Sequence, residues 1–122
     1  MNWLMIFVGG GIGSVLRFAL TIPFKSVATF FPWPTLIANF VATALIGALY
    51  FSGMRATSGS IWFFSAVGFS GGLSTFSTFS LETFRLFSSG HTFYAWVNIL
   101  LSIACCLLIV FLFSKMVVTV SQ

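Results

Sequence analysis

The sequence contains almost no charge. Its 122 residues include five lysines and arginines, one acidic residue and one histidine, so that charged side chains make up 5% of the chain. Soluble domains carry about 25% charged residues, which excludes an ordinary soluble globular domain. One carboxylate and one histidine cannot form a catalytic triad. We therefore expect no enzymatic activity, and no nucleic-acid partner either, since no nucleotide-binding loop is present.

Cysteine and histidine are too sparse to form a transition-metal cluster. Cys105 and Cys106 are adjacent within an apolar segment, and neighbouring residues on a helix point in different directions, which makes an intrachain disulfide improbable. We interpret both as small apolar filling residues. His91 is alone in a predicted loop, where an interfacial surface histidine is favoured over a ligand.

Long apolar stretches account for most of the chain, of which 59% is hydrophobic. A membrane-spanning helix needs about 20 predominantly apolar residues, and four segments meet this length, at about 3–22, 34–51, 61–87 and 93–116. The first is not a cleavable signal, because it lacks a basic start and leads directly into further spans. The sequence thus predicts an all-α membrane protein in the lipid bilayer, with residues 1–122 forming one domain of four transmembrane helices.

The third segment is interrupted by flexible and polar residues. Gly71 and Gly72 are followed by the run Ser74-Thr75-Phe76-Ser77-Thr78-Phe79-Ser80. Paired glycines permit a helix to break, and a break leaves carbonyls that must be buried in protein, line water or bind an ion. Hydroxyls and rings then recur every three residues along the helix. We interpret the segment as a helix broken at Gly71-Gly72 that lines part of an ion path.

Three polar side chains lie at predicted membrane depth, and each has a structural and a functional interpretation. Arg17 either snorkels to the interface or draws anions toward a vestibule. Asn39 either forms a helix–helix hydrogen bond or offers its amide donors to an ion. Glu82 can pair with Arg85 three residues later, an interpretation at least as well supported as a role in transport.

Phe76 and Phe79 alternate with the hydroxyls of the third segment. An aromatic ring has a negative face and a positive edge, so a ring edge can approach an anion favourably, which no aliphatic side chain does. The alternative is that the two rings only pack. Their position beside a predicted helix break favours a role in the ion path.

The basic residues are nearly balanced between the two sides of the predicted bundle, with Arg17 inside the first span. With a cytoplasmic N-terminus, Arg55 and Lys115 lie inside, whereas Lys25 and Arg85 lie outside. An excess of Lys and Arg normally marks the cytoplasmic side, and its absence permits insertion in both orientations. An antiparallel dimer of one gene product could then form; the alternative is that other signals fix a single orientation.

Chain length also favours a second copy, because four short helices do not easily enclose a pathway. The first span carries small residues that allow helices to approach closely, either within one chain or between chains. These residues are Gly9, Gly10, Gly13 and Ser14.

Three motifs follow one another along the chain. They are Gly9-Gly10-Gly11-Ile12-Gly13-Ser14-Val15-Leu16-Arg17, Thr35-Leu36-Ile37-Ala38-Asn39 and Gly71-Gly72-Leu73-Ser74-Thr75-Phe76-Ser77-Thr78-Phe79-Ser80-Leu81-Glu82. In this combination the sequence resembles the CrcB/Fluc family of bacterial fluoride channels over all four predicted spans. The resemblance implies a passive fluoride-selective channel that exports fluoride across the bacterial plasma (inner) membrane. It also implies an antiparallel, dual-topology homodimer with two pores and a central structural sodium ion.

The resemblance further implies specific sites. The residues at the family's fluoride-pore positions are Asn39, Phe76, Ser77, Thr78, Phe79, Glu82 and Cys106. Arg17 corresponds to a vestibular arginine of the first span. The backbone carbonyls of Gly71 and Ser74, contributed by both subunits, would hold the sodium ion.

The sequence departs from the family pattern in the second and fourth spans. Pro34 stands where a glycine usually precedes Thr35, and Thr43 replaces a later glycine. Cys106 and Val110 fall where family members can carry serine and threonine. A thiol is a weaker donor than a hydroxyl, and valine offers none. A different polar track, a slower pore or a chain that works beside a paired homologue would each accommodate these differences.

Two other functions stay open. A small dual-topology, proton-coupled multidrug or cation antiporter needs a membrane carboxylate, typically in its first span, but that span holds Arg17 and no acid. A non-transporting subunit could scaffold a partner, although a hydroxyl-lined helix break argues against this. The sequence encodes no energy source, so we expect passive flow.

Overall fold

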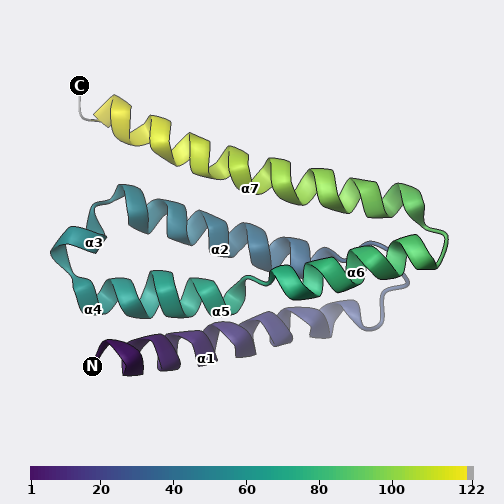
Figure 1. The fold of residues 1–122 in the computed structure, drawn as a ribbon, viewed down its shortest axis with the longest axis horizontal. Helices are drawn as coiled ribbons and strands as arrows, with labels where there is room; N and C mark the ends of the chain where they lie inside the picture. Colours follow the sequence, from purple (N-terminus) through teal and green to yellow (C-terminus); the bar gives the residue numbers. More distant parts are fainter. Residues whose placement is uncertain (121–122) are drawn as a thin grey trace.

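The molecule, known from a computed structural model, is described over residues 1–120 and contains no strand within that range. Its long helices run side by side, and the first and last helices of the described residues begin and end, respectively, at the same end of the molecule (Figure 1). The predicted all-helical class is therefore confirmed.

Within the described residues, three helices are long and apolar enough to cross a membrane. They are α1 (Asn2–Thr21), extended by a short 3-10 turn, η1 (Ile22–Phe24); α2 (Trp33–Phe51); and α7 (Thr92–Val120). Pro34 lies in the first turn of α2, where its missing N–H leaves no helical hydrogen bond unmade. These helices agree with the first, second and fourth predicted segments within a few residues.

The third predicted segment consists of several shorter pieces. After the single turn α3 (Met54–Thr57), it comprises α4 (Gly59–Trp62), the π-helix η2 (Phe63–Ser70), α5 (Gly71–Leu73) and α6 (Phe76–Ser88). No single helix here has the length of a span, so the count of four spans stays a prediction. Together the pieces form one interrupted row beside α1 and α2 (Figure 1).

The position predicted for the helix break is wrong. Gly71 and Gly72 are helical, and the backbone becomes extended at Ser74 and Thr75, with ψ values of 154° and 122°. The reason is an N-cap: the Thr75 hydroxyl accepts the N–H of Thr78 at 3.2 Å and thereby starts α6. The glycines serve a different purpose, which is close packing against α1.

Glycines let α1 approach η2 and α5 backbone against backbone. Gly9 and Gly13 are buried, and a Cβ added to either would collide with the carbonyl oxygen of Phe64 or Phe69, respectively. A Cβ on Gly72 would similarly meet the carbonyl of Gly10. The small-residue stripe of the first span is therefore a seam within the chain.

The glycine seam predicts a position-specific effect of adding one methyl group. Gly13→Ala should destabilise the fold by about 1–3 kcal/mol, because the backbone of η2 cannot yield as a flexible side chain would. Gly11→Ala is the matched control, since no atom lies within 4 Å of its added Cβ. SDS titration of the purified protein measures both free energies of unfolding. Equal stability of the two variants would contradict the seam.

Candidate functional site: a cavity at the helix break

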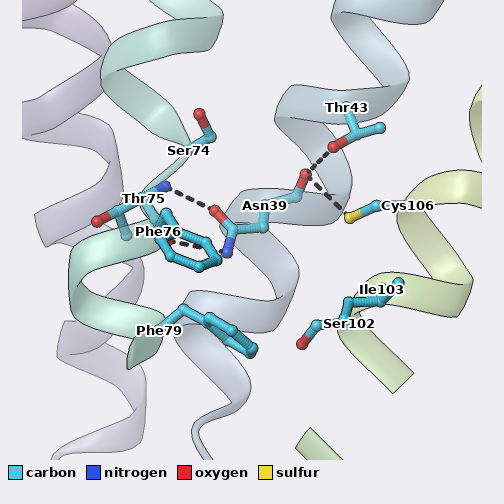
Figure 2. Close-up of a pocket in the computed structure, with 9 residues that line it drawn as sticks. All are labelled: Asn39, Thr43, Ser74, Thr75, Phe76, Phe79, Ser102, Ile103 and Cys106. Atoms are coloured by element: carbon cyan, nitrogen blue, oxygen red, sulfur yellow. Dashed lines mark hydrogen bonds between the residues drawn. The ribbon is translucent and has the colours of Figure 1, made fainter. Parts of the chain in front are cut away.

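A cavity of about 260 Å³ lies where α2, α6 and α7 meet beside the helix break. Figure 2 shows its lining, in which polar groups of α2 and α7 face two aromatic rings of α6. The lining residues are Asn39, Thr43, Ser74, Thr75, Phe76, Phe79, Ser102, Ile103 and Cys106. None of them carries a charged side chain.

Asn39 holds the interrupted backbone in place. Its Oδ1 accepts the N–H of Thr75 at 2.7 Å, and its Nδ2 donates to the carbonyl oxygen of Thr75 at 3.2 Å (Figure 2). One side-chain amide thus satisfies both polar groups of a residue that has left the helix. Because Asn39 carries two N–H donors, one remains for another acceptor. The helix–helix interpretation of Asn39 is confirmed, and this spare donor leaves its predicted pore role open.

Three other donors around the cavity are bonded to the protein. The Thr43 hydroxyl donates to the carbonyl of Asn39 at 2.7 Å, and the Cys106 thiol approaches the same oxygen at 3.9 Å. The Thr75 hydroxyl donates to Oγ1 of Thr78 at 3.2 Å. Cys106 therefore lies in the cavity wall, as expected of a pore residue, but its weak donor points toward the backbone of α2.

Phe76 and Phe79 form one wall of the cavity. Their ring centroids lie 5.6 Å apart with an interplanar angle of 40°. Phe79 is half-buried, whereas Phe76 is 79% exposed although it directly follows the break. Ser77, the third predicted pore residue of this turn, is exposed and does not line this cavity; its hydroxyl lies 3.2 Å from that of Thr75.

A second cavity of about 190 Å³ lies on the other side of the break. Arg17, Thr78 and Glu82 line it, and Thr75 lines both cavities. Arg17 donates from Nε to the carbonyl of Gly72 at 3.1 Å. Arg17, the predicted vestibular arginine, is thus held against the helix break. Thr78 and Glu82, two predicted pore residues, line the same cavity.

Glu82 is bonded to α2. Its Oε1 accepts a hydrogen bond from the Thr35 hydroxyl at 2.9 Å, while its Oε2 is buried without a hydrogen-bond partner. Arg85, which was expected to pair with Glu82, therefore makes no hydrogen bond to Oε2. A buried carboxylate oxygen without a partner is costly unless water or an ion reaches it through the cavity.

The two predicted sodium ligands lose their helical partners at the break. In a continuous helix the carbonyl of Gly71 would accept from the N–H of Thr75, but that donor goes to Asn39. The N–H of Thr78, which would bond the carbonyl of Ser74, goes to the Thr75 hydroxyl. Within residues 1–120 there is no group of three or more His, Cys, Asp or Glu side chains that could bind a metal.

Sequence reasoning missed several polar residues of the site. Asn98, Ser102 and Thr83 are buried between α6 and α7, and Ser102 lines the main cavity. Asn98 and Ser102 are four residues apart in an otherwise apolar segment, which places both on one helix face. That spacing could have predicted a polar contact between this helix and a neighbouring one.

Comparison with known proteins gives one family. Residues 4–113 match the family described as CrcB-like protein, Camphor Resistance (CrcB). A "Fluoride-specific ion channel FluC" from Coxiella burnetii is 40% identical over 111 residues, covering 88% of this chain and 90% of its own length. A protein of the same name from Geobacter sulfurreducens is 41% identical over 107 residues, covering 85% and 86% of the two chains. Another from Shewanella amazonensis is 38% identical over 118 residues, covering 95% of each.

The contacts of Asn39 predict a graded loss of stability. Asn39→Ala removes both hydrogen bonds to Thr75 and should cost about 1–3 kcal/mol, because backbone groups at the break would lose their partners. Asn39→Asp keeps an acceptor for the N–H of Thr75 but sets its second carboxylate oxygen against the carbonyl oxygen of Thr75, so it should be at least as destabilising as Asn39→Ala. SDS titration measures the series. An alanine variant as stable as wild type would contradict the role of Asn39 at the break.

Proposed function

The chain belongs to the CrcB family of fluoride-specific ion channels, and from this premise we propose that it conducts fluoride passively out of the cell through a pore beside the helix break. Membership of a channel family also places it among transport proteins and not among enzymes. We further propose the plasma (inner) membrane of a bacterium as its location, in keeping with its three helices of membrane-spanning length.

The observation that carries the proposal is the pairing of Phe76 and Phe79 with Asn39 around one uncharged cavity. Fluoride is small and strongly hydrated, so a pore must replace its water with donors. The spare N–H of Asn39 and the positive ring edges supply such contacts without a fixed charge. Conduction needs binding that is strong enough for the ion to enter and weak enough for it to leave, and a full positive charge in the cavity would oppose release.

The remaining predicted pore residues extend the path past the break. Thr75 lines both cavities, and Thr78 and Glu82 line the second one beside Arg17. The guanidinium would attract an anion to this end, while the hydroxyls would replace part of its hydration shell. Ser77 is exposed on the same turn. It would line the anion path only if a surface from outside this chain covered it.

We propose that the channel is an antiparallel homodimer. Arg55 lies in α3 and Lys115 near the end of α7, both at the end of the molecule where α1 begins, whereas Lys25 follows η1 and Arg85 lies near the end of α6, both at the opposite end (Figure 1). Nearly balanced basic charge at the two ends supports insertion in both orientations. The 79% exposure of Phe76 supports a covering surface, which a second copy would provide.

A structural sodium ion at the dimer centre is consistent with the donors at the break. Gly71 is exposed, nothing lies within 4 Å of a Cβ built on it, and its carbonyl has lost its helical donor. Hard cations prefer oxygen ligands, and unwound backbone in membrane proteins commonly supplies them to Na⁺. The carbonyls of Gly71 and Ser74 from each of two copies would surround one ion. Its charge would offset the cost of burying unpaired carbonyls.

Two alternatives use the same fold. In a proton-coupled antiporter Glu82 would exchange protons, but this carboxylate lies beyond the break and is bonded to Thr35. In a heterodimeric fluoride channel, a homologue would replace the second copy and supply the donors that Cys106 and Val110 lack. Both are distinguished from the homodimeric channel by flux through the purified chain alone.

The first functional prediction concerns flux. Liposomes containing the purified chain should release fluoride and retain chloride when a potassium ionophore removes the opposing voltage. A fluoride electrode and a chloride electrode follow the two ions, with protein-free liposomes as the control. Fluoride retention by folded, dimeric protein would contradict the homodimeric channel and favour a paired homologue, whereas proton-coupled cation exchange would favour the antiporter.

The second functional prediction concerns the rings. Phe76→Ile and Phe79→Ile should each reduce fluoride flux at least about tenfold, because isoleucine keeps much of the apolar bulk but removes the positive ring edge. Phe84→Ile is the matched control, since Phe84 lies on the same helix, is 66% exposed and does not line the cavity. Near-normal flux in both pore variants would mean that the rings only pack.

A further inference from the structure

Asn98 is the largest fully buried side chain of the described residues, at 1% exposure. It lies on α7 and contacts Thr83 of α6 and Ser102 one turn further along α7. Neither Asn98 nor Thr83 lines the main cavity, but Ser102 does, opposite Phe79 (Figure 2). Asn98 therefore connects the wall of the proposed pore with the helix that carries its rings.

The direction of every hydrogen bond in this network follows from one carbonyl. The carbonyl oxygen of Phe79 can only accept, so the hydroxyl of Thr83 donates to it, at 2.7 Å. Having used its one proton, Thr83 can only accept from Asn98. The Nδ2 of Asn98 therefore faces Thr83 at 2.9 Å.

The same reasoning fixes the orientation of Ser102. Because the amide nitrogen of Asn98 faces Thr83, its oxygen Oδ1 faces Ser102 at 3.3 Å and can only accept. The Ser102 hydroxyl thus directs its proton at Asn98 and has only lone pairs left for the cavity. An anion entering the cavity meets these lone pairs unless it draws the proton away from Asn98.

We propose that Asn98 is a positioning residue of the anion path. Asn98 holds the Ser102 proton away from the cavity, so that only a strong hydrogen-bond acceptor in the cavity can draw the proton back. The inference rests on the proposed fluoride conduction. Fluoride accepts hydrogen bonds far more strongly than chloride does. The Ser102–Asn98 distance of 3.3 Å exceeds the usual 2.7–2.8 Å of hydroxyl hydrogen bonds, so the proton is held loosely.

This arrangement has two consequences for conduction. Competition from Asn98 weakens anion binding at Ser102, which favours release of the ion. It also penalises a weak acceptor such as chloride, which would face the lone pairs. Asn98 thereby acts on selectivity without touching the ion.

Fluoride release from liposomes, measured at several internal fluoride concentrations, tests the inference. In Asn98→Leu the Ser102 proton is free, so the half-saturating fluoride concentration should fall roughly three- to tenfold, the worth of one net hydrogen bond. The ratio of fluoride to chloride release should fall with it. On a Ser102→Ala background, the Asn98→Leu substitution should leave the half-saturating concentration unchanged.

A second pair of variants tests the same inference if Asn98→Leu does not fold. Thr83→Val keeps the shape of Thr83 but removes the acceptor that orients the Asn98 amide, so its half-saturating concentration should also fall. Thr83→Ser restores the hydroxyl and should restore the wild-type value.

Each outcome decides the matter. Fluoride retention by wild-type liposomes overturns the proposed function together with this inference. Wild-type release with unchanged half-saturating concentrations in the Asn98 and Thr83 variants overturns the inference alone. Equal shifts with and without Ser102 also overturn it, because a purely structural effect of Asn98 would not depend on that hydroxyl.

Discussion

The structure depends on one constraint: backbone groups released from a helix at membrane depth must find other partners. The chain leaves the helix at Ser74 and Thr75, and side chains from neighbouring helices bond several of the released groups. Asn39 of α2 bonds both polar groups of Thr75, and Arg17 of α1 bonds the carbonyl of Gly72. The residues that bond the backbone at the break are thereby brought together around the two cavities. The same contacts that satisfy the backbone therefore also form the site.

Close packing makes this repair possible. Gly9 and Gly13 bring the backbone of α1 onto η2 and α5, which places Arg17 within reach of Gly72. On the other side, α7 packs along α2 and α6 and carries Ser102 and Cys106 to the cavity wall. The cavity lined by two aromatic rings and by no charged side chain supports the proposed conduction of an anion, and the chain belongs to the CrcB family.

Much of this could be predicted from the sequence, because apolar length determines spans and isolated polar residues at membrane depth need partners. Asn39, Phe76 and Phe79 were predicted to share a site, and they line one cavity. The break was placed too early, since glycine permits both a break and close helix contact, and only the packed structure shows which applies. Asn98 was missed because a hydrogen bond between helices depends on their relative rotation, which one sequence does not specify.

The π-helix η2 constrains the number of residues in its segment. Gly68 of η2 and Gly72 of α5 both face α1, near Ile6 and Gly10 respectively. Each residue of an ordinary α-helix turns the chain by about 100°. Losing one residue between Gly68 and Gly72 would therefore change the angle between the two glycines about the helix axis and turn Gly72 away from α1. The seam thus constrains the spacing of the two glycines as well as their identity, because an added Cβ at either position would meet the backbone of α1.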